Sequence, residues 1–282
     1  MNKTTNITAT KSQRIINKFQ ELKAKNQCAF VSYICAGHPN GNISQQVLNN
    51  LPNAGVDIIE LGVPFLDPAG DGPIIENASR KAIENGMTLK KTLIMVEEFR
   101  KNNQEIPIIL MSYYNPILNF GVEKFFIEAE NAGVDGLLVV DLPIEEQQEI
   151  ITIIEKYKID LIGLIAPTTN EDRIADIAKQ SSGFLYLISL LGITGTKLAN
   201  AEENILRIEK IKKITKLPIV VGFGIKSNIQ ATQFANIGAE GVVIGSSIVT
   251  IIDEASRDIE NQQLALEKIS NKIIEFSKAI KS

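Results

Sequence analysis

The sequence predicts an α/β fold in which eight parallel strands, each followed by a helix, close into a (β/α)8 barrel. The first observation is that short runs rich in β-branched residues alternate with amphipathic stretches along the 282 residues. Strands that alternate with helices form βαβ units. The second is that most runs are almost entirely apolar, as expected for parallel strands covered on both faces. Eight such units in a chain of this length are typical of a closed barrel.

The elements follow one another without an interrupting linker. An extra helix over about residues 12–25 precedes the first strand, and amphipathic patterns of helical period follow the strands. No low-complexity segment divides the chain, so we expect one barrel domain over residues 1–282. The predicted strands cover residues 29–34, 57–63, 106–112, 136–142, 160–165, 183–189, 217–224 and 240–246.

An internal echo, by which we mean three stretches of similar sequence, supports repeated βα units. The stretch NAGVDIIELGVP (53–64) resembles NAGVDGLLVVDLP (131–143), and NIGAEGVVIG (236–245) has the same outline. Each reads as a helix end, a glycine at the C-cap position and then a strand. Any βα protein can reuse glycine at this point, so the echo indicates architecture and carries no functional meaning.

Composition narrows the classes of function. The apolar fraction of 44% and the charged fraction of 22% are ordinary for a soluble globular protein. The net charge of −4 argues against a broad nucleic-acid surface. The chain has no apolar run of membrane-spanning length, and its first residues lack the apolar core of a secretory signal. We therefore expect a cytoplasmic protein that contacts neither nucleic acid nor membrane.

Cysteine and histidine are too scarce for most metal or thiol chemistry. Cys28 and Cys35 are read as reduced thiols, and His38 is the one histidine. This set disfavours a zinc site or a Cys–His nucleophile, so we expect no metal. His38, in the turn after the first strand, is interpreted as a surface or turn residue. The chemistry must then rest on carboxylates.

Glu60 is the first candidate. In the strand DIIELGV, alternation places Ile58, Glu60 and Gly62 on the face toward the barrel interior. Glu60 lies near the carboxyl end of this strand, where barrel enzymes place catalytic groups. Burial there raises the pKa of a carboxyl toward the range that suits proton transfer. The alternative is a glutamate exposed at the barrel rim.

Two more carboxylates follow in FLDPAGDGP, where two prolines and two glycines indicate a shaped loop. Asp67 is a candidate for a turn-forming residue that bonds backbone amides. Asp71 is either another turn former or a catalytic group that the loop brings to a substrate, and the spacing alone does not decide between them.

Glycine-rich loops follow the last three predicted strands: GITGT (192–196), GFGIKS (222–227) and GSSIV (245–249). Exposed amides and helix N-termini bind phosphate without a basic side chain. In barrels of this type the loops after strands 7 and 8 form such a site. Three loops at the right strand ends favour a phosphate site over simple tight turns. Lys226 is read as an exposed residue of the following helix.

Over essentially its full length the chain resembles the tryptophan synthase alpha subunit family, whose fold is a TIM barrel. The resemblance rests on the order and spacing of six stretches: IELGVPFLDPAGDGPIIENA, PIILMSYYNPI, GVDGLLVVDLP, GFLYLISLLGITG, PIVVGFGIKS and GVVIGSSIV. It implies a lyase that cleaves indole-3-glycerol phosphate to indole and glyceraldehyde 3-phosphate. The family's alpha chain needs no cofactor. It passes indole to a beta subunit, where pyridoxal phosphate condenses it with serine, in an α2β2 heterotetramer.

The resemblance also implies roles for individual residues. Glu60 matches the acid/base that protonates indole C3 and takes the hydroxyl proton of the glycerol chain. Asp71 matches the carboxylate that accepts from the indole N–H and stabilises the protonated ring. Thr194 matches a loop residue that bonds this carboxylate when the site closes. The implied substrate contacts are Tyr33, Met111, Tyr113 and Tyr186, and the implied phosphate site is Gly195, Gly224, Gly245 and Ser246. Without the resemblance, we would interpret Tyr33, Met111 and Tyr186 as ordinary side chains that fill the barrel interior.

The chain departs from the family pattern in two loops. Leu66 stands where serine or threonine is usual, and Gly70 where alanine is usual. Leu190 and Leu191 replace a polar or basic residue and a small one. Both loops concern closure and the contact with the beta subunit. Asp141, at the end of the fourth predicted strand, is either a ligand group or a loop cap.

Three other functions stay open beside the lyase in a complex. One is a free-standing lyase that releases indole, and another is a related barrel acting on a different phosphorylated substrate. The third is a largely non-catalytic subunit that activates a partner. Glu60 and Asp71 at their spacing favour the indole lyase.

Overall fold

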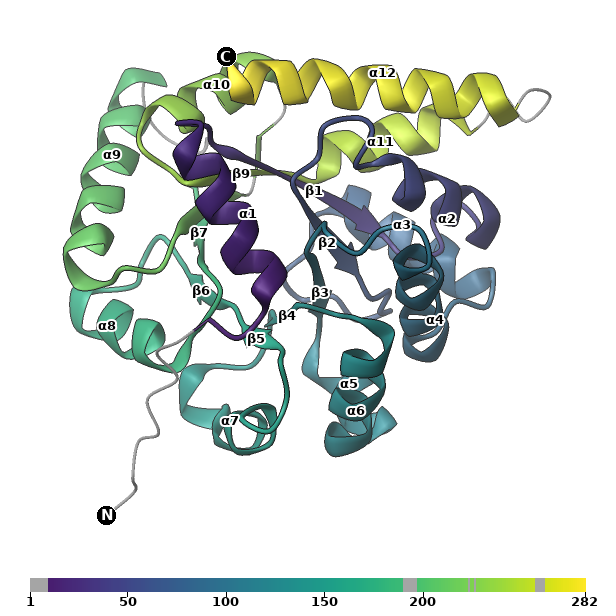
Figure 1. Ribbon diagram of the computed structural model, residues 1–282, viewed down its shortest axis with the longest axis horizontal. Coiled ribbons are helices and arrows are strands. Elements are labelled where there is room, and N and C mark those ends of the chain that lie inside the picture. The colour runs from purple at the N-terminus through teal and green to yellow at the C-terminus, as the bar shows by residue number, and fades with distance from the viewer. Residues whose placement is uncertain (1–9, 190–196, 223, 226, 257–261) are drawn as a thin grey trace.

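The computed structural model describes residues 10–189, 197–222, 224–225, 227–256 and 262–282. At its centre nine parallel strands form one sheet in the order β5-β4-β3-β2-β1-β9-β8-β7-β6 (Figure 1). The sheet curls into a nearly closed barrel, which confirms the predicted fold class. The strands are β1 (Ala29–Cys35), β2 (Ile58–Gly62), β3 (Ile108–Ser112), β4 (Gly136–Val139), β5 (Asp160–Leu161), β6 (Gly163–Ile165), β7 (Leu185–Ile188), β8 (Ile219–Gly222) and β9 (Gly241–Ile244).

The two ends of this sheet order are joined through a single residue. β5 pairs with β4, β6 pairs with β7, and only Ile162 separates them. The Ile162 amide still donates to the Leu137 carbonyl, at 2.9 Å, before Gly163 pairs with Leu185. The predicted strand 160–165 is therefore one extended segment that changes neighbours at Ile162, and the barrel has eight strand positions.

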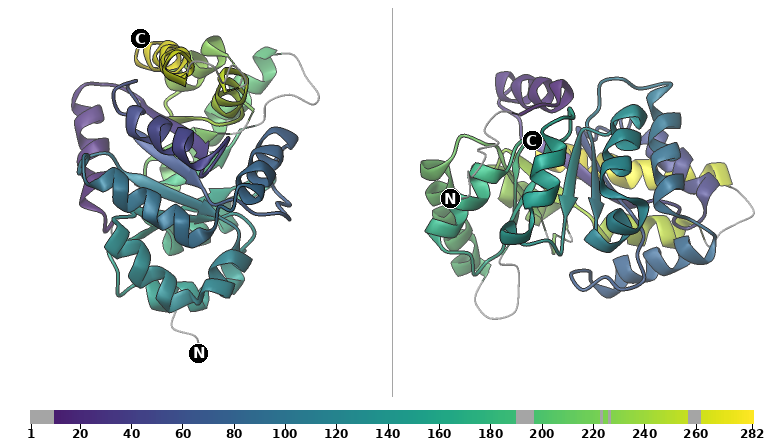
Figure 2. Two further views of the ribbon diagram at one scale, coloured as in Figure 1. Left: turned by 90° about the vertical axis from the view of Figure 1, so that its right-hand side faces the viewer. Right: turned by 90° about the horizontal axis from the view of Figure 1, so that it is seen from below.

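Helices surround the strands on all sides (Figure 2). α12 packs against α10, α11 and α2. α1 corresponds to the extra helix predicted over 12–25 and lies across one end of the barrel. In the described part of the chain, no helix is both long and apolar enough to cross a membrane. The helices are α1 (Gln13–Ala24), α2 (Gly41–Asn50), α3 (Pro73–Glu84), α4 (Leu89–Arg100), α5 (Tyr114–Phe120), α6 (Val122–Ala132), α7 (Gln148–Ile154), α8 (Glu171–Gln180), α9 (Lys197–Ile214), α10 (Asn228–Asn236), α11 (Ser246–Ala255) and α12 (Gln262–Lys281), with a 3-10 turn at η1 (Ile144–Glu146).

The acids of the internal echo share one structural role at the amino ends of the strands. Asp57 accepts from the Phe30 amide at 2.9 Å, Asp135 from the Ile108 amide at 2.8 Å, and Glu240 from the Ile219 amide at 2.9 Å. Each carboxylate thus bonds the backbone at or just before the neighbouring strand. Because these amides have no partner in the strand ladder, the acids satisfy donors that burial would otherwise leave unpaired.

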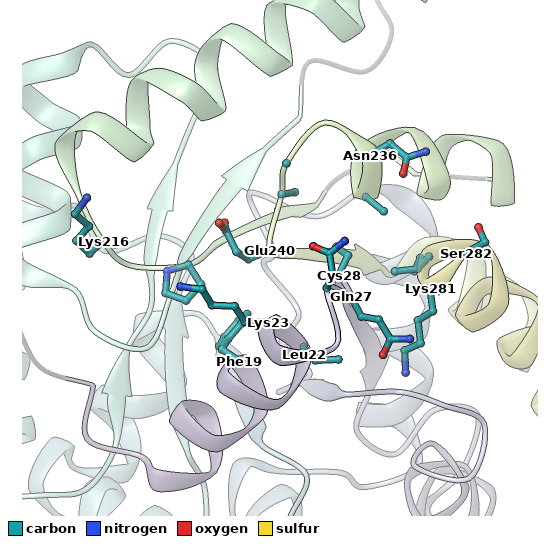
Figure 3. Close-up of a pocket in the computed structure, with 16 residues that line it drawn as sticks. Phe19, Leu22, Lys23, Gln27, Cys28, Lys216, Asn236, Glu240, Lys281 and Ser282 are labelled. Atoms are coloured by element: carbon teal, nitrogen blue, oxygen red, sulfur yellow. The ribbon is translucent and has the colours of Figure 1, made fainter.

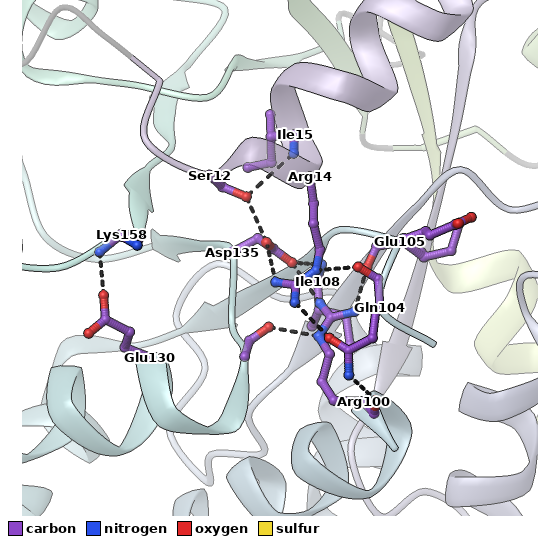
Figure 4. Close-up of polar contacts among 12 residues, drawn as sticks. Ser12, Arg14, Ile15, Arg100, Gln104, Glu105, Ile108, Glu130, Asp135 and Lys158 are labelled. Carbon is purple, nitrogen blue, oxygen red and sulfur yellow. Dashed lines mark hydrogen bonds and ion pairs between the residues drawn. The ribbon is translucent and has the colours of Figure 1, made fainter. Parts of the chain in front are cut away.

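Asp135 is the most heavily bonded of the three (Figure 4). Its Oδ1 accepts from Ser12 Oγ at 2.6 Å and Arg14 Nη1 at 3.1 Å, and its Oδ2 accepts from Arg100 Nη2 at 2.6 Å as well as from Ile108. Ser12 is the N-cap of α1. The carboxylate therefore ties α1, α4 and β3 together and holds α1 across the amino end of the barrel.

Candidate active site

Glu60 lies inside the barrel, as the alternation of its strand predicts. It sits in β2 opposite Tyr33 of β1 and Ile109 of β3, and only 3% of the residue is exposed. Burial, with a further contribution from the Asp71 charge, raises the pKa of the Glu60 carboxyl to about 8. Glu60 therefore holds a proton at neutral pH, in a site where it can give that proton to a bound molecule.

Asp71 ends the loop between β2 and α3. Its amide donates to the Pro68 carbonyl at 3.2 Å, which closes a turn over Pro68–Asp71. The Asp71 Oδ1 atom is buried, and no described residue hydrogen-bonds to it. Burial raises the pKa of the Asp71 carboxyl to about 6, although the Tyr113 hydroxyl acts to lower it. Asp71 is thus a charged acceptor at neutral pH with one oxygen available to a donor.

The two carboxylates line one cavity of about 260 Å³ at the carboxyl ends of the strands. Tyr33, Met111 and Tyr186 form part of its wall. Burial raises the pKa of both phenols well above the ordinary value, so they stay neutral. The cavity walls are mostly apolar, which suits a flat aromatic group.

The two wall tyrosines are seated in the same way. A Cβ placed on Gly62 would overlap the Tyr33 hydroxyl, and one placed on Gly222 would overlap the Tyr186 hydroxyl. In the strand register, each glycine lies two positions beyond the residue opposite its tyrosine. Glycine at these positions lets the ring lie across the neighbouring strand and close the cavity floor.

The wall of this cavity also includes three of the predicted phosphate residues. Gly224, Gly245 and Ser246 all line it. Gly245 is the N-cap of α11, so the first amides of that helix face the cavity end without an intrahelical acceptor. Such a helix end binds phosphate through its N–H groups and dipole. Thr194, Gly195, Lys226, Leu190 and Leu191 lie outside the residues that the structure describes.

Tyr113 is placed beside the cavity, against the Asp71 loop. Its hydroxyl accepts from the Gly70 amide at 3.0 Å, and its ring lies 5.4 Å from that of Phe65. The cavity wall contains the other three implied substrate contacts but not Tyr113. Its substrate contact stays a prediction.

Of the three remaining candidates, Asp141 and His38 make side-chain contacts within the fold, and Asp67 makes only a backbone contact. Asp141, in the loop after β4, accepts from the Tyr114 amide at 2.7 Å, so this loop residue caps the amino end of α5. The Asp67 side chain is exposed, and its backbone carbonyl accepts from Ala69 at 3.1 Å. His38 lies in the turn after β1, which confirms the turn alternative and not the surface one. It is buried, with Nε2 3.3 Å from Asp253, because the turn folds back beneath α11.

Sequence reasoning missed the rest of the apolar wall, which comes from the start of α3, from the β8–α10 loop and from β9. These residues are Pro73, Ile74, Ile75, Ile225 and Val243. No local signal separates them from ordinary core residues. An apolar side chain that faces the cavity and one that faces the core give the same sequence pattern.

No other group in the described residues offers comparable chemistry. Cys28 and Cys35 are free, and burial raises the pKa of both thiols to about 12. No three His, Cys, Asp or Glu side chains in the described ranges are placed to hold a metal ion. A larger hollow of about 580 Å³ opens at the amino end, between α1 and α12 (Figure 3). Its Glu240 and Lys281 are already engaged, by Lys212 and Asp57 respectively.

Comparisons with known proteins agree on one family. The model of the family "Tryptophan synthase alpha chain" matches residues 19–281. A curated tryptophan synthase alpha chain of Caulobacter vibrioides is 43% identical over 269 residues, which cover 95% of this chain and 96% of the relative.

Solved structures give the same result. The tryptophan synthase subunit alpha of Legionella pneumophila has a TM-score of 0.87 at 34% identity, covering 95% of this chain and 98% of that one. A chain of tryptophan synthase from M. tuberculosis, in an aminoacrylate-bound form, has a TM-score of 0.83 at 30% identity, covering 95% and 99%.

Proposed function

The chain belongs to the tryptophan synthase alpha chain family, and from this premise we propose that Glu60 and Asp71 carry out its lyase reaction. The reaction is the retro-aldol cleavage of indole-3-glycerol phosphate to indole and glyceraldehyde 3-phosphate. The observation that carries the proposal is the cavity itself. It holds a protonated glutamate, a charged aspartate, an apolar wall and a helix N-terminus within one cavity.

The protons balance with one acid. Glu60 gives its proton to indole C3, which places a positive charge on the ring nitrogen. The resulting carboxylate then takes the proton of the hydroxyl group that is attached to the carbon bonded to C3. The bond from C3 to that carbon breaks, its electron pair restores the aromatic ring, and the hydroxyl carbon becomes the aldehyde. Glu60 ends protonated, as it began.

Asp71 supplies the electrostatic part of the step. Its charged carboxylate accepts from the indole N–H and stabilises the ring while that ring is positive. The buried Oδ1 atom provides the acceptor. A fixed charge in a dry cavity is far more effective than the same charge in water. The phosphate lies at Gly224, Gly245 and Ser246, with the N–H groups of α11 as donors, and Tyr33, Met111 and Tyr186 hold the indole.

A beta-subunit partner follows from the family, and we infer an α2β2 assembly in which pyridoxal phosphate is bound by the partner. Two exposed apolar side chains beside the cavity support a docking face there. Leu66 is 65% exposed in the Asp71 loop, and Ile74 is 41% exposed at the start of α3. Leu66 is also one of the departures from the family pattern, so this chain presents a more apolar loop to its partner.

The test is indole release from indole-3-glycerol phosphate by the purified chain, alone and with a beta subunit. We expect slow release that rises when the partner is added. Fast release by the chain alone would indicate a free-standing lyase. No release in either case would leave another phosphorylated substrate or a purely activating subunit.

The Glu60→Gln variant is the companion measurement. We expect it to lose cleavage by at least about a thousandfold, because the amide can neither give nor take the proton. Its binding of glycerol 3-phosphate, measured by calorimetry, should be unchanged because the proposed phosphate site is built from the β8–α10 loop and the start of α11, and not from β2. Retained turnover would remove Glu60 from the mechanism.

A further inference from the structure

Tyr113 contacts the loop that carries Asp71 at two separate points. The tyrosine follows β3 directly, is the N-cap residue of α5 and is 4% exposed. Its hydroxyl accepts from the Gly70 amide at 3.0 Å, and its ring packs at 5.4 Å from Phe65 near the other end of the loop. A rigid residue at a strand end therefore holds both ends of a glycine- and proline-rich segment.

The same hydroxyl also acts on the neighbouring carboxylate. Because it accepts from the Gly70 amide, its own proton is available to Asp71. The hydroxyl lowers the pKa of the Asp71 carboxyl against the effect of burial. The Asp71 Oδ1 atom is left without a described partner. One phenol thus fixes the backbone before Asp71 and engages its side chain, while an acceptor oxygen stays free for the substrate.

Gly70 fits this contact closely. A Cβ at position 70 would lie 2.9 Å from Val140 Cγ1 and 3.4 Å from the Tyr113 hydroxyl. The first distance is too short for an undisturbed methyl group, so any side chain would push the loop away from β4 and from Tyr113. Alanine is usual here in the family. The glycine of this chain therefore permits a closer approach of loop and tyrosine.

We propose that Tyr113 is a positioning residue that holds Asp71 in place through its hydroxyl and the Gly70 amide. The proposal rests on the lyase activity proposed above. It assigns to Tyr113 a role that acts through Asp71, with no need for contact between the phenol and the indole.

The experiment compares Tyr113→Phe with the wild-type chain in the complex with the beta subunit. Loss of the hydroxyl should lower kcat/KM by about tenfold, because Asp71 is then poorly placed for the charged ring. It should also move the acid limb of the kcat/KM profile to higher pH, because the removed hydroxyl favoured the charged form of Asp71. If Tyr113 only contacted indole, Tyr113→Phe would change KM and leave the acid limb of the pH profile in place. That outcome would overturn the proposal.

Tyr114→Phe is the matched control. The Tyr114 hydroxyl donates to Glu149 at 2.8 Å, outside the cavity, so its loss should not move the pH profile. Gly70→Ala is a second test of the same contact, and it should shift the acid limb in the same direction as Tyr113→Phe. An unmoved limb in Gly70→Ala would show that the amide contact does not position Asp71.

A readout without turnover separates this proposal from the lyase assignment. Infrared titration of the isolated chain, with Asp71→Asn as the blank, follows protonation of the Asp71 carboxyl directly. We expect a higher titration midpoint in Tyr113→Phe than in the wild type. An unchanged midpoint would reject the role of Tyr113, even if the chain cleaves indole-3-glycerol phosphate. A shifted midpoint in a chain that releases no indole would support Tyr113 and reject the lyase.

Discussion

Glu60 and Asp71 share a cavity, and their pKa values lie further apart than those of two exposed acids. Burial raises both pKa values, to about 8 for Glu60 and about 6 for Asp71, and the Asp71 charge adds to the shift of Glu60. Between these values one acid is protonated and the other charged, which is the pair of states that the reaction needs. We therefore expect kcat/KM to be highest between about pH 6 and pH 8.

This arrangement has a cost in stability. The pKa of the Glu60 carboxyl rises from 4.5 to about 8 on folding, so the unfolded chain binds fewer protons between these pH values. The free energy of unfolding contributed by Glu60 therefore falls as the pH rises through that window, and the penalty is absent below it. A catalytic acid is kept at the expense of stability, as is common in active sites.

Asp71→Asn tests the coupling between the two carboxyls. The substitution should lower kcat by about tenfold to a thousandfold, because the charge that stabilises the protonated ring is lost. It should also move the basic limb of kcat/KM to lower pH, because the neutral amide no longer raises the pKa of Glu60. Turnover by the variant across a pH series measures both. An effect confined to KM would make Asp71 a binding residue only.

At the scale of elements, the strand–loop–helix unit β9–α11 builds the phosphate end. β9 stops at Ile244, Gly245 caps α11, and Ser246 begins the helix. The backbone of Gly245 has φ −112°, which any residue can adopt. A Cβ there would lie 3.5 Å from Tyr33 Cβ, an ordinary contact. A side chain at this position therefore changes the charge of the site more than its shape.

Gly245→Asp should consequently weaken binding of glycerol 3-phosphate by about tenfold or more, since a carboxylate would face the phosphate. Gly245→Asn has nearly the same size and no charge, and should bind much more tightly than the aspartate variant. Calorimetry on the two variants separates charge from bulk. Equal affinities of wild type and Gly245→Asp would place the phosphate elsewhere.

At the scale of the whole molecule, the two ends of the barrel use acids in opposite ways. At the amino end Asp57, Asp135 and Glu240 are bonded to backbone amides and cations. At the carboxyl end Glu60 is buried and Asp71 is half-buried, and both have raised pKa values. The first group stabilises the barrel, and the second makes it reactive. This division is the usual one for barrel enzymes.

Asp135→Asn should therefore lower stability without altering the site. The substitution leaves Arg100, which is 5% exposed, without its charged partner, and we expect a loss of about 3–5 kcal/mol in the free energy of unfolding. Urea unfolding measures this loss, and the KM of the folded variant should match the wild type. Glu21→Gln is the control, because its pairs with Lys18 and Lys25 on the surface of α1 are worth only about 1 kcal/mol or less. A loss as small as that of the control would show that the buried network is dispensable.

The sequence by itself determined the order of strands and helices, the inward position of Glu60 and the glycine-rich ends of the last strands. These features depend on local periodicity and spacing, which the chain carries without reference to distant residues. The same local patterns carried the resemblance to the family, and the resemblance implied the reaction.

Only the tertiary structure decided which partners the polar groups find. Asp141 proved to cap the amino end of α5, and His38 to be buried under α11. The acids of the echo bond amides of neighbouring strands, and Tyr113 lies against the Asp71 loop. Each of these contacts joins residues far apart in the chain. Their side chains have several possible partners until the barrel closes, and burial then decides which partner satisfies each polar group.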